Sequence, residues 1–399
     1  MGLDYADQVY ADHLILPWHQ SIRELVPGVE PFDIHTHTGW KDPDGFALTA
    51  PRLIEALELT GSRAAVFTLA DPEGYPGAND RIIGEAAESG GRLVPFLRVD
   101  PADDPLAEAE RALDAGAVGV KMHPRAERFR LADERVEPVF ALADERRLPV
   151  IVHAGRGIPA LGRDAVDIAR RHPGVRLILA HAGISDLAWI WREAAELPNL
   201  LFDTAWWTPS DLLALFAHIP PGQVLFGSDA PYGTPLHSEI MATRCALQAG
   251  LSLDQVRAVM GGQAARLVAR EDLLDLGPAP GPRPSESDLL MERAYTFLIS
   301  AINREMVRGS GDESLQLTRL ALEVGDESPQ ASVCRSVLAL IDRHDHYADD
   351  PSGLDELDKG AHFFPKLHLL VLAATVARTP AVPAPEPEPE DVGARQHGS

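Results

Sequence analysis

Two histidines one residue apart, His35 and His37, close a short apolar run, and their types and spacing could bind a metal ion. Alternate residues of a strand point to the same face, so both imidazoles can reach one ion. By itself the motif is weak, because chance supplies about half a His-x-His pair in a chain of this histidine content. A second pair, His344 and His346, has no further ligand near it in the pattern, and we interpret it as a solvated helix end.

Three more metal-competent side chains, His153, His181 and Asp229, each close a different apolar run. Imidazoles with one carboxylate suit Zn²⁺ and leave an open position for water. Taken singly, each residue has a plain alternative as a buried polar group that is satisfied by its neighbours. Taken together with the first pair, they favour one site, provided that the fold brings the ends of these runs together.

The apolar runs alternate with helical patterns, and this alternation predicts the fold. Eight runs are typical of buried parallel strands: 31–37, 63–69, 92–99, 118–123, 148–153, 175–181, 199–204 and 223–229. Helical spacing falls at 51–60, 79–89, 105–115, 134–146, 163–172, 186–196, 209–217, 237–249 and 253–270. We therefore expect an α/β fold, a (β/α)₈ TIM barrel, whose strand ends converge on one mouth. The alternative is a doubly wound open sheet, but the turn after the first strand lacks the glycine-rich phosphate motif.

The rest of the chain predicts further parts around the barrel. We expect an N-terminal helical extension over 1–30, the barrel over 31–276 and a proline-rich linker over 277–287. A C-terminal helical domain is expected over 288–378, with helices at 288–307, 313–323, 330–342 and 362–378. Residues 379–399 are rich in proline and glutamate and have little to bury, which predicts a disordered tail.

Composition excludes several classes of function. The chain has 60 acidic residues against 36 lysines and arginines, a net charge of −24, which disfavours nucleic-acid and membrane-surface binding. We see no apolar run long enough to span a bilayer and no signal peptide at the start. The two cysteines, Cys245 and Cys334, cannot form a disulfide framework, so a cytoplasmic setting is expected.

As a series, the residues at the strand ends resemble the amidohydrolase superfamily. Within it, they are most similar to the amidohydrolase-related family that includes aminocarboxymuconate-semialdehyde decarboxylase and lactone hydrolases. The matching strings are Asp33-Ile34-His35-Thr36-His37, Gly119-Val120-Lys121-Met122-His123-Pro124, His153-Ala154-Gly155, Ala180-His181-Ala182-Gly183 and Phe226-Gly227-Ser228-Asp229-Ala230-Pro231. The resemblance covers about residues 31–270 and departs from the family at Gln263, where asparagine is more usual.

The resemblance implies one Zn²⁺ or another divalent ion, with His35, His37, His153 and Asp229 as its ligands. It also implies that His181 is a catalytic group beside the metal. Chemistry agrees with these roles, because zinc activates water near neutral pH and Asp229 can accept its proton. His181 can then polarise a substrate carbonyl or stabilise the developing oxyanion.

Lys121 leaves the number of ions open. In binuclear members of the superfamily, a carboxylated lysine at the corresponding strand bridges two metals. Related members thought to use one metal carry a similar Lys-x-His-Pro string, so we favour one ion here. Lys121 is then a contact for a substrate carboxylate or the partner of an acidic residue in the barrel.

Several other residues near strand ends are candidates for substrate binding, and structural roles stay open for all of them. Arg98 could bind a carboxylate with two hydrogen bonds or form a salt bridge inside the barrel. The remaining candidates are His123, Arg156, Trp206 with its neighbour Trp207, and Tyr232. Ser185 and Asp186 are expected to cap the helix that follows them.

Three hypotheses for function follow. The first is a metal-dependent hydrolase of a small carboxylated or cyclic substrate, such as a lactone or amide. The second is a nonoxidative decarboxylase that uses the same site. The third is a catalytically silent barrel that acts through the helical domain. That domain could cap the mouth, form a homodimer surface or bind another partner.

Overall fold

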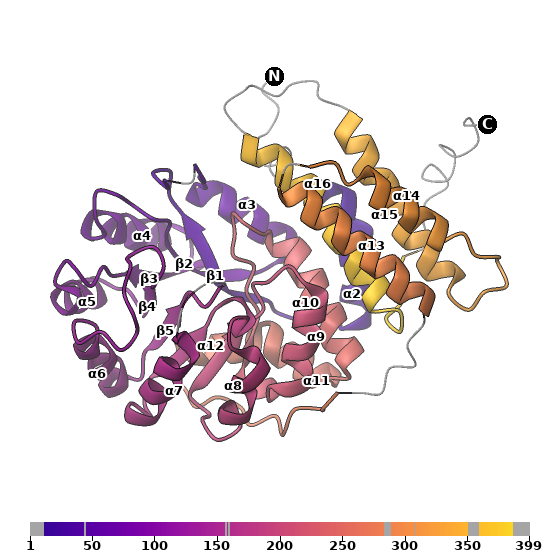
Figure 1. The fold of residues 1–399 in the computed structure, drawn as a ribbon. Coiled ribbons are helices and arrows are strands. Elements are labelled where there is room, and N and C mark those ends of the chain that lie inside the picture. Colours follow the sequence, from indigo (N-terminus) through magenta and orange to yellow (C-terminus); the bar gives the residue numbers. More distant parts are fainter. Residues whose placement is uncertain are drawn as a thin grey trace.

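Eight parallel strands form the centre of the molecule in the computed structural model, which describes residues 12–43, 45–155, 158, 160–282, 289–307, 309–349 and 359–385. The side chains of residues 348, 349 and 359–365 lie outside this description. The strands are β1 (Phe32–Thr38), β2 (Arg63–Thr68), β3 (Leu93–Arg98), β4 (Gly119–Met122), β5 (Pro149–Val152), β6 (Arg176–Leu179), β7 (Leu200–Asp203) and β8 (Val224–Leu225). Each strand pairs with the next in sequence order, so the predicted barrel topology is confirmed (Figure 1).

Backbone hydrogen bonds close the barrel between its first and last strands. The Ile34 amide donates to the Phe226 carbonyl at 2.8 Å, and the Asp229 amide donates to the His35 carbonyl at 2.8 Å. These bonds place the segment after β8 directly beside β1, so residues far apart in sequence share one edge of the mouth.

Helices follow the strands and surround them. They are α3 (Ala50–Thr60), α4 (Pro76–Glu88), α5 (Pro105–Asp114), α6 (Glu137–Arg146), α7 (Leu161–Arg171), α8 (Leu187–Ala194), α9 (Pro209–His218) and α10 (Pro235–Ala249). After α10 come α11 (Leu253–Arg257) and α12 (Gln263–Val268), joined by a π-helical turn at Ala258–Gly262. The Gln263 side chain donates to the carbonyls of Gly222 and Leu274 and accepts from the Leu274 amide, so this departure from the usual asparagine has a structural use.

Large apolar side chains fill the inside of the barrel. Phe67 and Phe96 are fully buried there with Ile151, Ile178 and other strand residues. The fit is tight at Gly119, where an added Cβ would lie 2.5 Å from the Phe96 ring. The interior is therefore a packed core.

Extra helices lie on one side of the barrel, and the predicted C-terminal helices are among them. They are α2 (Asp12–Leu25), α13 (Leu289–Met306), α14 (Asp312–Ala321), α15 (Ala331–Asp349) and α16 (Lys359–Arg378). Figure 1 shows the C-terminal helices bundled beside α10 and α2. One apolar cluster includes Trp18 of α2, Ile240 of α10 and Leu370 of α16, so these helices share a core with the barrel's outer layer. Among the described residues, no helix is both long and apolar enough to span a membrane.

Several strands end earlier than the apolar runs predicted. β5 stops at Val152, β6 at Leu179 and β8 at Leu225, so His153, His181 and Asp229 lie in the segments just beyond. The backbone of His181 has a φ of 58° and that of Asp229 a φ of 59°, which no strand can accommodate. The chain leaves the sheet at these points, and as a result the polar side chains face one another.

The structure corrects our interpretation of His344 as part of a solvated helix end. α15 continues past residue 342 to Asp349, and His344 is buried. Its Nε2 lies 3.0 Å from Glu305 and its Nδ1 lies 2.9 Å from Asp345. Only His346 of this pair is exposed.

The start of the predicted disordered tail is also packed. The buried guanidinium of Arg244 donates to the carbonyls of Thr379 at 3.1 Å, Val382 at 2.9 Å and Pro383 at 2.8 Å. These carbonyls follow the end of α16, where backbone acceptors lack helical partners. Arg244 satisfies them and so fixes residues that composition alone assigned to the tail. Residues 386–399 of the tail, 283–287 of the linker and 1–11 of the N-terminal extension lie outside the described residues.

Candidate metal centre

Two imidazole nitrogens of β1 converge on one carboxylate oxygen from the segment after β8. Nε2 of His35 lies 3.0 Å and Nε2 of His37 lies 3.1 Å from Oδ1 of Asp229. Burial would raise the pKa of Asp229, but the His35 and His181 imidazoles and the histidine hydrogen bonds hold it well below its usual range. Asp229 is therefore an ionised carboxylate among histidines.

Asp203, at the end of β7, orients this cluster, and our sequence reasoning missed it. Its Oδ2 accepts from Nδ1 of His35 at 2.7 Å, which leaves Nε2 of His35 to face Asp229. Its Oδ1 accepts from the backbone amide of His181 at 2.7 Å. The signal was present as a fully buried carboxylate that closes an apolar run, like the residues that we did select. Carboxylates that hold the far nitrogen of a ligand histidine commonly support metal sites.

Asp33 makes a second connection between β1 and the segment after β8. Its Oδ1 accepts from the amides of His35 and Ser228, both at 3.0 Å. The carboxylate is fully buried, and burial raises its pKa to about 7. Asp33 thus ties the backbone that carries His35 to the backbone that carries Asp229.

His181 and His153 form a hydrogen-bonded pair across the mouth. Nδ1 of His181 lies 2.8 Å from the Ala205 carbonyl, which can only accept, so this nitrogen carries the proton. Burial lowers the pKa of both histidines, and each is neutral. Nε2 of His181 therefore accepts, at 2.8 Å, from Nδ1 of His153. It follows that Nε2 of His153 carries a lone pair, and this buried atom has no hydrogen-bond partner among the described residues.

The placement of the proton on His37 tests whether these residues fit a metal ion. Burial lowers the pKa of His37 to about 3, so it is neutral with one proton for two nitrogens. Its Nδ1 lies 3.5 Å from the Thr68 carbonyl and its Nε2 faces Asp229, so either tautomer points one lone pair at an oxygen. A cation beside Nε2 removes this conflict. The donor set of imidazoles and a carboxylate suits a divalent ion such as zinc.

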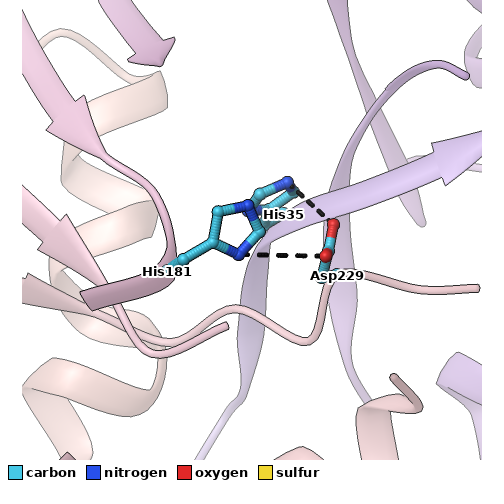
Figure 2. Close-up of side chains that lie close together, drawn as sticks. All are labelled: His35, His181 and Asp229. Atoms are coloured by element: carbon cyan, nitrogen blue, oxygen red, sulfur yellow. Dashed lines mark ion pairs between the residues drawn. The ribbon is translucent and has the colours of Figure 1, made fainter. Parts of the chain in front are cut away.

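His35, His181 and Asp229 offer one ligand atom each within 4.8 Å of one another (Figure 2). Nδ1 of His181 lies 3.8 Å from Oδ2 of Asp229, whereas the β1 histidines face Oδ1. The structure therefore brings together His35, His37, His181 and Asp229, with His153 joined to them through His181.

Lys121 reaches the same cluster from β4. Its Nζ lies 3.1 Å from Nε2 of His35 and 4.6 Å from the centre of the Phe67 ring. Burial lowers the pKa of this fully buried amine to about 8. No acidic side chain lies within ion-pair distance of it in the part of the chain that the structure describes. Of the roles expected for Lys121, the barrel ion pair therefore has no support.

Arg98 is engaged in a buried ion pair. Its Nη2 donates to Oε1 of Glu127 at 2.6 Å, and its Nη1 donates to the Thr68 carbonyl at 3.2 Å. Tyr75 also donates to Oε1 of Glu127, and its ring lies under the Arg98 guanidinium. This is the salt bridge that we weighed against a substrate-binding role for Arg98.

The remaining candidates line the mouth unevenly. His123 stacks on His153 with ring centres 3.8 Å apart, and Trp206 lies 6.3 Å from the His181 ring. The Tyr232 ring lies 6.0 Å from that of His37. Arg156 lies outside the described residues.

The expected capping role of Ser185 and Asp186 is wrong. Asp186 occupies the N-cap position of α8, but its side chain caps nothing there. It accepts instead from the Gly162 amide and from Nε1 of Trp189, both at 3.0 Å. Ser185 donates to the Gly155 carbonyl at 2.7 Å, so both side chains connect the segments that follow β5 and β6.

The sequence profile of a family described as amidohydrolase matches residues 32–270. No curated protein matches the chain. A candidate amidohydrolase from Staphylococcus aureus has a similar structure, with a TM-score of 0.50 and 15% identity over 60% of this chain and 99% of that one. A 2,6-dihydroxybenzoate decarboxylase from Rhizobium gives 0.49 and 15% over 61% and 98% of the chains. A 4-oxalomesaconate hydratase from Rhodopseudomonas palustris gives 0.47 and 17% over 60% and 96%. At these identities, structural likeness shows a common fold alone.

Proposed function

Because the chain belongs to the amidohydrolase family, whose members are metal-dependent enzymes, we propose that it is a hydrolase with one divalent ion, zinc by preference. We propose a small carboxylated or cyclic substrate, such as a lactone or amide. The resemblance expected from the strand-end strings is confirmed by the family match. Family membership also identifies an enzyme that acts on small molecules, so we do not pursue the silent-barrel hypothesis.

One observation carries the proposal. Nε2 of His35 and Nε2 of His37 face the same oxygen of an ionised Asp229 at 3.0 and 3.1 Å. These three residues would hold the ion, and the free lone pair of His153 is the fourth proposed donor. When bound, a divalent ion there would lower the pKa of a water molecule and polarise a substrate carbonyl.

The chain's own residues supply the proton transfers. Asp229 has the carboxylate that accepts a proton from the attacking water and returns it to the leaving group. His181 lies 3.8 Å from this carboxylate and is neutral, so it can polarise the substrate carbonyl or stabilise the oxyanion. Asp203 holds the His35 ring and the His181 backbone in place while these transfers occur.

Lys121 supports decarboxylation as the second candidate function. Its buried amine lacks an acidic partner among the described residues and lies beside the proposed ligands. A substrate carboxylate would supply that partner, and every substrate of a decarboxylase carries one. Arg98, His123, Arg156, Trp206 and Tyr232 remain proposed as substrate contacts.

A paired assay separates hydrolysis from decarboxylation. The zinc-loaded protein is incubated with lactones, amides and aromatic acids, while acid production and CO₂ release are followed together. Acid without CO₂ supports the hydrolase, and CO₂ from an aromatic acid supports the alternative. Metal analysis of the same protein should give one ion per chain. A protein that binds no divalent ion would contradict both proposals.

Two proposals concern the setting of the enzyme. Cys245 and Cys334 are both buried and form no disulfide, which agrees with a cytoplasmic location. A homodimer through the helical region stays a prediction, and size-exclusion chromatography with light scattering would test it.

A further inference from the structure

The loop that carries Asp229 is a compact turn. Between β8 and α10, the amides of Tyr232 and Gly233 donate to the Asp229 carbonyl at 2.8 and 3.3 Å. A Cβ at Gly233 would lie 2.3 Å from the Ser228 carbonyl oxygen, so no larger residue fits at this position of the turn. Asp229 itself has a positive φ of 59°, a backbone conformation that residues other than glycine keep only where their surroundings hold them in it.

Contacts from outside the barrel fix this turn. Thr234, which caps α10, donates to Asp12 of α2 at 2.8 Å. The His368 imidazole of α16 hydrogen-bonds to the backbone of Tyr232, three residues after Asp229. A helix more than a hundred residues away in sequence therefore reaches the loop that carries the proposed metal ligand.

His368 is itself held firmly by α10. The His237 imidazole donates from Nε2 to the His368 carbonyl at 3.1 Å. The two rings stack with their centres 4.6 Å apart and their planes 20° from parallel. Both side chains are buried, with 3% and 8% of their surface exposed. Further along, Arg244 of α10 binds the carbonyls that follow α16, so a second set of contacts joins α16 to α10.

We propose that His368 is a positioning residue for the metal centre: it fixes the turn of residues 229–234 from α16 and so keeps Asp229 facing His35 and His37. This gives the C-terminal helices a role in the metal centre. The inference rests on the proposed metal site, because it concerns the placement of one of its ligands.

The first experiment removes only the hydrogen bond. His368→Phe keeps an aromatic ring to stack on His237 but cannot donate to Tyr232, whereas His368→Gln restores a donor. We expect His368→Phe to weaken zinc binding about tenfold, the lower end for residues that orient ligands. His368→Gln should recover most of that loss. Zinc affinity is measured by competition with a chromogenic chelator, at a temperature where circular dichroism shows folded protein.

A matched control uses the other buried histidine of the helical region. Among the described residues, the partners of His344 are Glu305 and Asp345, both in that region, so His344→Phe should lower the melting temperature and leave zinc affinity unchanged. Equal loss of zinc affinity in both variants would mean general destabilisation and would overturn the proposal.

A second variant keeps the proposal testable if His368→Phe does not fold. His237→Phe keeps the ring stack but removes the donor to the His368 carbonyl, and we expect a smaller loss of zinc affinity in the same direction. Wild-type affinity in the folded variants would overturn the role of His368 while leaving the metal site intact. Absence of zinc binding by the wild-type protein would instead refute the proposed function.

Discussion

The two sides of the barrel mouth differ in how fully their buried polar atoms are paired. On the side of β1, β7 and β8, every nitrogen of His35 and His37 faces an acceptor. Asp203 and Asp33 anchor the backbone around these histidines, although Oδ2 of Asp33 has no hydrogen-bond partner within the described residues. On the side of β3 to β5, three buried atoms have no hydrogen-bond partner within the described residues: Nε of Arg98, Oε2 of Glu127 and Nε2 of His153.

This difference distinguishes the groups that hold the site in place from the groups that would bind a ligand. Buried polar atoms are normally paired, and each exception calls for an explanation such as a ligand. The paired side has the geometry of a scaffold that holds ligand atoms in place before anything binds. On the unpaired side, a metal ion or a substrate would supply the missing partners of these atoms. The buried Lys121 amine lies between the two sides of the mouth.

The strongest test of the paired side removes its ligands. We expect His35→Ala or His37→Ala to reduce metal affinity by more than about 100-fold, beyond the effect of residues that only orient ligands, and to abolish activity. Metal content by mass spectrometry and chelator competition measure the loss. His346→Ala is the control, because it removes an exposed histidine from the other His-x-His pair. Full metal content in a β1 variant would exclude these residues as ligands.

Asp203 tests whether the scaffold matters apart from the ligands. Asp203→Asn keeps the shape of the side chain but removes the charge that orients Nδ1 of His35. We expect metal affinity to fall about 10- to 100-fold, the range for carboxylates behind ligand histidines. The chelator assay measures this directly, and circular dichroism checks the fold. An affinity within experimental error of the wild type would show that the paired side does not depend on Asp203.

Lys121 probes the boundary between the two sides. Lys121→Met keeps the length of the side chain and removes the amine. With one ion per chain, we expect unchanged metal content and a KM raised about tenfold or more for a carboxylated substrate, from loss of a charge-assisted bond. If Lys121 bridges two ions, metal analysis would give two per wild-type chain and one per variant, which would contradict the single-ion proposal.

Most of the polar residues at the barrel mouth were candidates from the sequence, but the hydrogen bonds between them were not predicted. Apolar runs that end in His153, His181 and Asp229 located the mouth, because buried parallel strands have an unmistakable composition. Asp203 ends the same kind of run, but its role depends on His35, 168 positions away, and no local pattern encodes that contact. His344 was misjudged for a similar reason: its partner Glu305 lies on another helix.

Asp12 gives the smallest effect and tests how the paired side is held from outside. Burial raises the pKa of Asp12 to about 6, from 3.8 in an unfolded chain. Between these values the folded protein binds more protons than the unfolded chain, so this residue's contribution to stability is complete below pH 3.8 and is lost as the pH rises through 6. Asp12→Asn keeps an oxygen to accept from Thr234 but does not titrate.

We therefore expect the stability difference between wild type and Asp12→Asn to change by up to about 3 kcal/mol from pH 4 to pH 7, in favour of the variant at pH 7. Urea unfolding of both proteins at the two pH values measures it, and taking the difference cancels the other titrating groups. A difference that stays constant with pH would mean that Asp12 is ionised in the folded protein. The hydrogen bond to Thr234 would then be charge-assisted, and α2 would hold the turn after β8 more strongly than a neutral side chain can.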